Sequence, residues 1–447
     1  MTHWHPGSWR TYPLYQYPPY DDPMGVQRVT ENLRGYPPLV APGEVELLTE
    51  ALAEAAAGRR FLLQGGDCAE RFSDCTAASI TARLQVLLQM SLVLTYATRK
   101  PVIRVGRMAG QYAKPRSADT ETVNGQVLPA YRGDLVNDVG TDPVSRRPDP
   151  ERMRWGYHHA AVTLNYIRAL IEGGFADLHH PEKWDLGFIE NSPHREAYRR
   201  IVDAITDAVT FMETIGGGGE TLRRVSFYTS HEALLLPYEE ALTRQDESGR
   251  WFNLGAHFLW VGYRTADPYG AHVHYLSGIA NPVGIKVGPD TRPDFFRKLL
   301  EKLNPSRLSG RLTVISRYGA ESVGEGLPAL IETARADGQP VLWCCDPMHG
   351  NTRTTAAGRK TRMLSDIFRE LEQTFEIHAA CGSVLGGVHF ELTGSAVTEC
   401  LGGSSGITEQ DLRTFYETAC DPRLNAEQSL EMAFLIARLL RQDHAPN

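Results

Sequence analysis

The stretch FLLQGGDC at residues 61–68 decides the fold, because an apolar run of strand length ends at a chemically reactive side chain, Cys68. Five further segments repeat this arrangement, and they end at or just before Arg107, Lys286, Arg317, His349 and Glu391. These segments are VIRVGR (102–107), GIKVGP (284–289), LTVISR (312–317), VLWCCDPMHG (341–350) and GGVHFELTG (386–394). In a (β/α)8 barrel the active site is assembled from the C-terminal ends of different strands. The repetition therefore predicts such a barrel.

Eight strands alternate with helices along the chain. The expected strands are 61–66, 102–107, 225–230, 257–262, 283–287, 312–317, 341–345 and 386–391. Helical patterns lie between them, among others at 76–97, 292–303 and 325–336. Strands without a polar face that alternate with helices are typical of a parallel sheet covered on both sides, and eight units favour closure into a barrel. After the eighth strand we expect a helix capped by Thr408 and Asp411, and then a closing amphipathic helix at 425–441.

The sequence also predicts two additions to the barrel. Residues 1–58 are expected to form an N-terminal extension with a first helix that stops at Gly58, and residues 59–447 the catalytic barrel. Eight prolines within residues 1–42 exclude a long helix there, and the aromatic residues among them predict an arm packed on the protein. The stretch 108–224, between strands two and three, is too long for a simple loop. It is expected to hold a barrel helix at 155–174 and inserted helices around 190–220.

The inserted helix has one apolar stripe, made of Tyr198, Ile201, Val202, Ile205, Val209 and Met212. Such a stripe predicts packing on a neighbouring subunit, on an added subdomain or on the barrel itself. Together with the aromatic arm it predicts a homodimer or homotetramer. The four glycines at 216–219 end this helix and lack the Lys-Ser/Thr that follows a phosphate-binding loop.

Composition limits the function classes. The chain has 447 residues, and its 42% of hydrophobic residues is typical of a soluble globular protein, while its net charge of -8 argues against broad nucleic-acid binding. No apolar run approaches a membrane span, and the N-terminus lacks the pattern of a signal peptide. Seven cysteines, two of them adjacent, argue against a secreted disulfide framework. We therefore expect a cytoplasmic protein that binds neither nucleic acid nor membrane.

Four side chains predict a metal site at the mouth of the barrel. Cys68, His349, Glu391 and Asp421 offer a thiolate, an imidazole and two carboxylates, a mixed set that suits a borderline divalent ion acting as a Lewis acid. The spacing of these residues along the chain matches no motif. The alternative to metal binding is a structural role, as a buried thiol for Cys68 or as a hydrogen-bonded histidine for His349. For the pairs His158–His159 and His179–His180 we expect no metal role.

Cations gather around the same mouth. They are Arg107, Lys114, Arg116, Arg264, Lys286 and Arg317. A buried cation needs an anion, which is either a protein carboxylate or a ligand. Six of them exceed what one carboxylate needs, so two phosphorylated ligands, or a phosphate and a carboxylate, are expected. Glu232, just after the third strand, is expected to act as a base or to position water; the alternative is a salt-bridge partner of one of these cations.

These segments closely resemble the type II, plant-type 3-deoxy-D-arabino-heptulosonate 7-phosphate (DAHP) synthases, over about residues 40–441. The matching motifs are QGGDCAE (64–70), GRMAGQYAKPRS (106–117), YTSHEALLL (228–236), NPVGIKVGP (281–289), ISRYG (315–319), CDPMHGNT (345–352), GGVHFELTG (386–394), TECLGG (398–403) and YETACDPRLN (416–425). The resemblance implies a (β/α)8 barrel and the activity of a 3-deoxy-7-phosphoheptulonate synthase. Such an enzyme condenses phosphoenolpyruvate with erythrose 4-phosphate at the entry to the shikimate pathway and aromatic amino acid biosynthesis.

The resemblance also implies a role for each matched residue. Cys68, His349, Glu391 and Asp421 would hold manganese or cobalt, and His349 would count among the catalytic residues. Phosphoenolpyruvate would be held by Arg107, Arg264, Lys286 and Arg317, with Trp260 beside them. The aldehyde substrate would meet Lys114, Arg116 and Ser117, and Asp346 would line the same pocket. Lys114 would protonate the developing alkoxide, and Glu232 would position the water that adds at C2.

One residue departs from the pattern of that family. The chain reads Gly262-Tyr263-Arg264-Thr265 where a glutamate usually precedes the arginine. If the contact there is made mainly by the main chain, Tyr263 preserves phosphate binding, but it alters charge and shape beside the substrate. The alternative acceptor is an imino sugar phosphate, as in amino-DAHP synthases of antibiotic pathways. A further hypothesis is a reversible disulfide between Cys68 and Cys420 that displaces the metal under oxidation.

Overall fold

The eight predicted strands form one closed, all-parallel barrel in the computed structural model, which describes residues 4–123, 125–175, 193–214 and 225–442. Around the barrel the order is β1 (Phe61–Gly66), β2 (Val102–Arg107), β5 (Phe227–Glu232), β8 (Phe258–Val261), β9 (Val283–Val287), β10 (Leu312–Ser316), β11 (Val341–Cys345) and β14 (Leu385–Glu391). The barrel prediction is therefore confirmed. Only the third strand is displaced, so that Glu232 ends β5 instead of following it.

The register of the strands positions the site. Gly66, the last residue of β1, is paired with Arg107 on β2 and with Glu391 on β14. Three neighbouring strands therefore end at one level, and the loop that carries Cys68 leaves the barrel between Arg107 and Glu391. Gly66 has a φ of +145°, and a Cβ there would lie 2.6 Å from the carbonyl oxygen of Arg107, so only glycine permits this close approach.

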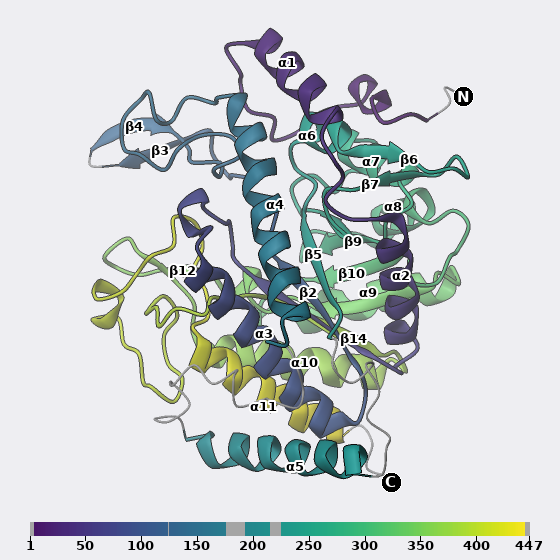
Figure 1. The fold of residues 1–447 in the computed structure, drawn as a ribbon, viewed down its shortest axis with the longest axis vertical. Coiled ribbons are helices and arrows are strands. Elements are labelled where there is room, and N and C mark those ends of the chain that lie inside the picture. Colours follow the sequence, from purple (N-terminus) through teal and green to yellow (C-terminus); the bar gives the residue numbers. More distant parts are fainter. Residues whose placement is uncertain (1–3, 124, 176–192, 215–224, 443–447) are drawn as a thin grey trace.

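Helices cover the outside of the barrel (Figure 1). They are α2 (Pro42–Ala56), α3 (Ala77–Thr98), α4 (Glu151–Glu172), α6 (Leu236–Ala241), α7 (Ala271–Gly278), α8 (Pro293–Leu303), α9 (Val323–Ala336), α10 (Leu364–Ala380) and α11 (Ala426–Gln442). Three two-stranded hairpins lie outside the barrel: β3–β4 (Thr120–Val123, Gln126–Pro129), β6–β7 (Thr243–Gln245, Trp251–Asn253) and β12–β13 (Arg353–Thr354, Lys360–Thr361). The closing helix expected at 425–441 is confirmed as α11.

Helix α3 corrects one expectation about apolar runs. Its 22 residues are long and apolar enough to cross a membrane by length and composition. The helix is mostly buried, however, and it packs on α11. A barrel helix covered on several sides carries the same composition as a membrane span, and we read α3 as such a core helix.

The N-terminal arm packs on the barrel, as predicted. Trp9 is buried, and the Trp4 indole N–H donates to the carbonyl of His274 over 3.0 Å. The expectation that proline excludes a long helix is wrong for α1 (Pro23–Arg34), which has 12 residues. Its proline stands at the first helical position, where no backbone donor is lost, and the Asp22 side chain caps the helix by accepting from Gly25 N–H.

The inserted helix α5 (Arg195–Thr214) packs on its own barrel, which is one of the three arrangements that its stripe allows. Tyr198 and Ile201 are buried, the helix contacts α3, and His194 stacks on Phe434 of α11 with ring centroids 4.8 Å apart. Figure 1 shows α5 lying beneath α3 and α11. The side chains of Ile205, Val209 and Met212, the glycines 216–219 and His179–His180 lie outside the described residues.

The helix expected after Thr408 is reduced to a 3-10 turn, Asp411–Arg413. The two predicted capping residues meet, because the backbone N–H and the hydroxyl of Thr408 both donate to the Asp411 carboxylate, over 2.8 and 2.7 Å, but the turn begins after Gln410, whose side chain does not cap it. The chain then leaves the helical path at Phe415, whose N–H donates to the Thr398 hydroxyl and whose carbonyl accepts from Thr398 N–H. These bonds to a neighbouring segment replace the next helical turn.

Candidate active site

A cavity of about 250 Å³ lies at the C-terminal ends of the strands and gathers most of the predicted site residues. Twelve of the fifteen line it: Cys68, Arg107, Lys114, Glu232, Trp260, Tyr263, Arg264, Lys286, Arg317, His349, Glu391 and Asp421. Arg116, Ser117 and Asp346 do not line it. Residues from the ends of most barrel strands therefore meet at one place, which is how active sites of this architecture are built.

A group of metal-ligating atoms lies at one side of this cavity. Ligand atoms of Cys68, Glu391 and Asp421 are all within 4.8 Å of one another, and His349 Nε2 lies 3.0 Å from a carboxylate oxygen of Glu391. A thiol, two carboxylates and an adjacent imidazole form a mixed donor set that fits a borderline divalent ion. The residues present are therefore suited to the metal that the sequence predicts.

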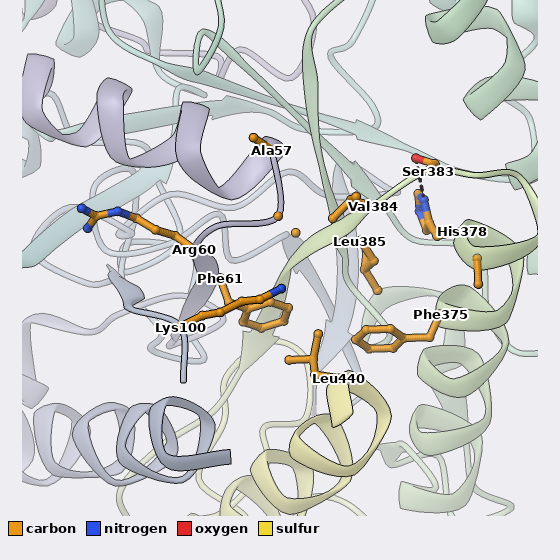
Figure 2. A pocket seen from close by; sticks show the side chains of 13 residues that line it. Ala57, Arg60, Phe61, Lys100, Phe375, His378, Ser383, Val384, Leu385 and Leu440 are labelled. Carbon is orange, nitrogen blue, oxygen red and sulfur yellow. Dashed lines mark hydrogen bonds between the residues drawn. The ribbon is translucent and has the colours of Figure 1, made fainter. Parts of the chain in front are cut away.

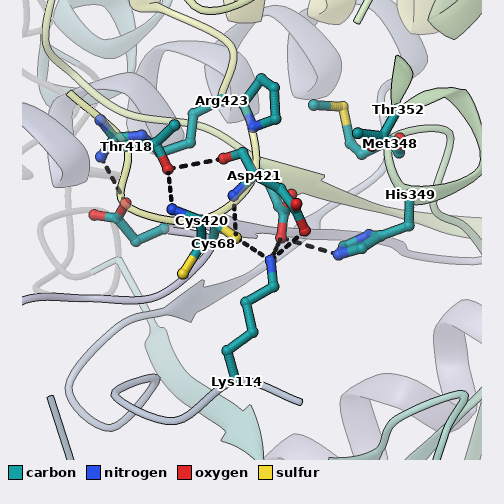
Figure 3. Close-up of polar contacts among 12 residues, drawn as sticks. Cys68, Lys114, Met348, His349, Thr352, Thr418, Cys420, Asp421 and Arg423 are labelled. Atoms are coloured by element: carbon teal, nitrogen blue, oxygen red, sulfur yellow. Dashed lines mark hydrogen bonds and ion pairs between the residues drawn. The ribbon is translucent and has the colours of Figure 1, made fainter. Parts of the chain in front are cut away.

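The Lys114 ammonium lies among the same acidic groups (Figure 3). It contacts Cys68 Sγ and Asp421 Oδ2, and it lies 3.6 Å from Glu391 Oε1. Burial alone would raise the pKa of Asp421, but the charges of Lys114, Arg362 and Lys360 together lower it. Burial would likewise lower the pKa of Lys114, and the charges of Asp421 and Cys68 reverse this and raise it. Lys114 is therefore a firmly protonated group.

Asp346 orients His349 from below. Its carboxylate is fully buried, lies 2.7 Å from His349 Nδ1 and accepts a bond from the Lys286 ammonium over 2.8 Å. With Nδ1 bound in this way, the imidazole presents Nε2 to Glu391. A metal-ligating histidine commonly has its other nitrogen held by a carboxylate. Asp346 thus supports the cavity from beneath and does not line it.

The buried Arg107 guanidinium joins the Cys68 loop to Glu391. It donates to the carbonyls of Asp67 and Cys68 over 3.0 and 3.2 Å and to Glu391 over 3.1 Å. Its central carbon lies 5.2 Å from the centre of the Trp260 ring. Protein groups therefore occupy part of the hydrogen-bonding capacity of Arg107, as expected if it has a structural role. The side chain nevertheless borders the cavity.

The other cations near the site differ in the protein groups with which they interact. Arg317 donates to the His349 carbonyl over 2.9 Å and lies over the Tyr263 ring, 4.9 Å from its centre. Arg264 donates to the Ser117 hydroxyl over 2.8 Å. Arg116 pairs with the Glu121 carboxylate outside the cavity. Arg264 and Arg317 are therefore two cations of the cavity that pair with no carboxylate in the described part of the chain.

Glu232 faces the cavity with an unsatisfied carboxylate oxygen. Oε1 is buried, and in the described part of the chain it has no hydrogen-bond partner; the same holds for the Trp260 indole N–H. Burial raises the pKa of Glu232, and the nearby Lys286 offsets part of this effect. A Cβ at Gly262 would lie 2.0 Å from Oε1, so glycine leaves room for the carboxylate. Buried polar atoms without partners in a cavity indicate a place for a ligand or water.

Three further residues belong to the site and were not predicted. His389 contacts the Arg107 guanidinium and lies edge-on to Trp260, Arg362 donates to Glu391 over 2.8 Å, and Gln111 borders the cavity. His389 had a signal, because it precedes Glu391 by two residues on one strand and must share its face. Gln111 and Arg362 lie in loops, where no periodicity reveals them.

A chain of five buried charges ties together the loops that carry the ligands. It runs Glu399–Arg423–Asp67–Arg83–Glu70, with Arg423 2.7 Å from Asp67 and 2.8 Å from Glu399, and with Arg83 3.1 Å from Asp67. Asp67 directly precedes Cys68, and Arg423 follows Asp421 by two positions. The ion pair between them therefore fixes the separation of two predicted metal ligands.

We expect Asp67→Asn to lower the affinity for a divalent metal about 10- to 100-fold, the usual cost of losing a group that holds metal ligands in place. The variant keeps the volume of the side chain and removes the charge that faces Arg423 and Arg83. Titration calorimetry with Mn²⁺ on folded protein measures the effect. Glu417→Gln is the matched control, because Glu417 is 3.8 Å from Arg423 and its side chain is 44% exposed. Equal metal affinities for wild type and Asp67→Asn would contradict this role.

Glu370 on α10 supports the loop that follows Arg317 and gives the fold a pH dependence. It accepts from the N–H groups of Tyr318 and Gly319, both over 2.9 Å. Burial raises the pKa of Glu370 from 4.5 to about 7. The folded state therefore binds this proton more tightly than the unfolded state does. The resulting stability is complete below about pH 4.5 and is lost as the pH rises through about 7.

Glu370→Gln is expected to flatten this part of the stability profile. Urea unfolding between pH 5 and pH 8 should show wild-type stability falling with pH more steeply than that of the variant. Glu372→Gln, on the same helix but paired with Arg438 at the surface, should keep the wild-type slope. A slope unchanged in Glu370→Gln would show that Glu370 titrates at its ordinary pKa.

Cys68 and Cys420 are both free and buried, and they share a small cluster with Tyr131. Their proximity agrees with the hypothesis of a reversible disulfide, which stays a prediction. Mass spectrometry of the oxidised, metal-free protein tests it, and free thiols at both positions would rule it out.

Comparison with known proteins shows the family to which the chain is similar. Residues 4–437 match the model of the class-II DAHP synthetase family. A phospho-2-dehydro-3-deoxyheptonate aldolase of Neurospora crassa is 48% identical, over 98% of this chain and 95% of the relative. One of Streptomyces coelicolor is 47% identical, over 97% of each chain. Among solved structures, a truncated 3-deoxy-D-arabino-heptulosonate 7-phosphate synthase of Thermotoga maritima aligns over 86% of both chains, with 11% identity and a TM-score of 0.31.

Proposed function

The chain belongs to the class-II DAHP synthetase family, and from this we propose that its barrel mouth is the site where phosphoenolpyruvate condenses with erythrose 4-phosphate. The products are DAHP and inorganic phosphate, so the protein is a 3-deoxy-7-phosphoheptulonate synthase of aromatic biosynthesis. One observation carries the assignment of the site. A single cavity of about 250 Å³ holds the metal-ligating group and, beside it, Arg107, Arg264, Lys286 and Arg317.

The four cations supply a site for phosphoenolpyruvate. The guanidinium groups fit the carboxylate and phosphate with paired donors, and Lys286 adds a point charge. Trp260 provides a buried wall with an N–H that has no partner in the described part of the chain. As the C–O bond breaks, negative charge grows on the departing phosphate, and preorganised cations stabilise it without further movement.

The loop Lys114-Pro115-Arg116-Ser117 is proposed to receive erythrose 4-phosphate. The bond between Ser117 and Arg264 brings this loop against the cations of the first substrate. Arg116 is paired with Glu121, a half-buried carboxylate that would share it with a phosphate. The Ser117–Arg264 bond places the two proposed substrate sites next to each other, which suits a reaction that joins the substrates.

Cys68, His349, Glu391 and Asp421 are proposed to hold the divalent metal, which the resemblance to the family implies is manganese or cobalt. When bound, the metal supplies Lewis acidity at the acceptor aldehyde. Lys114 remains an ammonium because of its acidic neighbours and is the proton donor to the alkoxide that forms. Glu232 lines the cavity, has a buried carboxylate oxygen without a partner in the described part of the chain, and is proposed to position the water that adds at C2 of phosphoenolpyruvate.

Tyr263 is proposed to be a platform for Arg317 rather than a selector of another acceptor. Its hydroxyl donates to the Asp290 carboxylate over 2.9 Å, and its ring lies under the Arg317 guanidinium. A ring fixed in this way leaves a neighbouring carboxylate unnecessary. The relatives bear the name of the ordinary synthase, and an imino sugar phosphate as acceptor is accordingly not favoured.

Steady-state assay of the purified, metal-loaded protein tests the function. We expect release of phosphate that requires both phosphoenolpyruvate and erythrose 4-phosphate, at a rate of about 10 s⁻¹, a typical enzyme turnover. The same assay after removal of metal by a chelator should show no turnover. Phosphate release with an imino sugar phosphate but not with erythrose 4-phosphate would overturn the choice of acceptor.

We propose a cytoplasmic location, because phosphorylated substrates and the free, buried cysteines both fit that compartment. A homodimer or homotetramer stays a prediction. The N-terminal arm and the first turns of α5 are the two features that suggested an oligomer. Both pack on their own barrel, so contacts within one chain already bury part of their apolar surface. Light scattering coupled to size-exclusion chromatography measures the oligomeric state.

A further inference from the structure

A second cavity, of about 410 Å³, lies at the opposite end of the barrel from the active site (Figure 2). Its walls include Phe61 and Leu385, the first residues of β1 and β14, whose other ends lead to Cys68 and Glu391. Phe375 of α10 and Leu440 of α11 complete an apolar surface. The volume falls within the range of small-molecule sites, about 300–1,000 Å³.

Two cations border this apolar cavity. Arg60 and Lys100 are half-buried, and in the described part of the chain neither side chain has an ion pair or a hydrogen bond. Figure 2 shows the Lys100 ammonium on the side of Val384 and Leu385, whereas the Arg60 guanidinium points away from Phe375 and Leu440. None of the thirteen lining residues is acidic. The lining residues of the cavity therefore carry positive charge and include no carboxylate.

A buried polar atom adds to the case for a ligand. His378 is 1% exposed, and its Nδ1 lies 3.1 Å from the Ser383 hydroxyl. Its Nε2 has no hydrogen-bond partner among the described residues. Burial lowers the pKa of His378 to about 3, so the ring is neutral and the positive charge of the cavity comes from Lys100 and Arg60 alone. Buried polar atoms of native proteins are rarely left without a partner.

We propose that this cavity binds a small monocarboxylate with a single aromatic ring or an apolar body of that size. Phe61, Phe375, Leu385 and Leu440 would surround the ring, and Lys100 would meet the carboxylate. The absence of acidic lining residues selects against molecules that carry an ammonium beside the carboxylate, since that group would lose its hydration without compensation. An aryl propionate is the simplest molecule of this class.

Titration calorimetry with 3-phenylpropionate tests the proposal on the full, metal-loaded chain. Saturating phosphoenolpyruvate keeps the probe out of the active site. We expect binding at least tenfold tighter than that of 3-phenylpropionamide, which has the same shape without the charge, and no binding of 2-phenylethylamine. Equal binding of the acid and the amide would overturn the role of the cations.

Two variants locate the site. Lys100→Gln removes one charge and is expected to weaken binding of 3-phenylpropionate at least tenfold. Ala379→Trp fills the cavity from an exposed position on α10 and is expected to abolish binding. Arg59→Gln is the matched control, because Arg59 adjoins the cavity in sequence but pairs with Glu54 and does not line it.

Three outcomes would overturn the proposal. One is an affinity that neither Lys100→Gln nor Ala379→Trp changes. A second is binding that phosphoenolpyruvate abolishes, which would place the probe in the active site. The third is a loss of stability in Lys100→Gln with unchanged binding. That result would show that the cations serve only the C-terminal ends of α2 and α3, which they follow along the chain and where helix dipoles favour positive charge.

Discussion

Replacing Cys68 with alanine is expected to remove the bound divalent metal and to lower kcat/KM by about 10³-fold or more, because a Lewis acid contributes several kcal/mol to stabilising the transition state. Cys68 is 1% exposed, and its sulfur belongs to the group whose ligand atoms lie within 4.8 Å of one another. Metal content by mass spectrometry and the rate of phosphate release measure the two effects on one preparation.

Cys420→Ala is the matched control for this prediction. Cys420 is also buried, shares the cluster of Cys68 and Tyr131, and adjoins Asp421, but it is not a predicted ligand. We expect it to keep metal and to stay within a few-fold of wild-type activity. Full metal content and activity in Cys68→Ala would remove the thiolate from the proposed ligand set.

Lys114→Met is expected to lower kcat by about 10²- to 10⁴-fold, the usual contribution of a general acid, without weakening the metal. The ammonium contacts Cys68 and Asp421 and lies 3.6 Å from Glu391. Without the positive charge of Lys114 beside them, these ligands should bind the divalent metal more tightly. Opposite effects on metal affinity in Lys114→Met and Cys68→Ala would therefore separate a proton donor from a metal ligand.

Lys360→Met provides the comparison for Lys114. Lys360 pairs with the other carboxylate oxygen of Asp421 over 2.8 Å, but its side chain is 45% exposed. Exposed ion pairs contribute little, so both kcat and metal affinity should stay near wild type. A kcat near the wild-type value in Lys114→Met would assign the proton transfer to another group.

The sequence predicted the barrel well because its strands are short, apolar and separated by turns and helices. The same pattern placed Cys68, Glu391 and Arg107 at strand ends, and the parallel register then brings them to one level. Helix α1 was missed, because a proline was taken to exclude a helix that in fact begins at that residue.

What the sequence could not provide is the connection between loops. Arg423, Glu399 and Arg83 are far apart along the chain, and only the fold shows that they form one line of buried charges past Asp67. Asp346 was expected to line the cavity, and the structure instead places it beneath His349 and Lys286. Whether the side chain of a loop residue points into the cavity depends on the residues that it contacts. A loop has no periodic pattern from which these contacts could be predicted.

Anomalous diffraction from crystals soaked in Mn²⁺ and phosphoenolpyruvate tests the central claim most directly. We predict one strong manganese peak at the barrel mouth, within about 2.5 Å of donor atoms from Cys68, His349, Glu391 and Asp421. Phosphoenolpyruvate should lie beside it against Arg107, Lys286 and Arg317. A manganese peak bound by other residues, or phosphoenolpyruvate bound outside this cavity, would contradict the account.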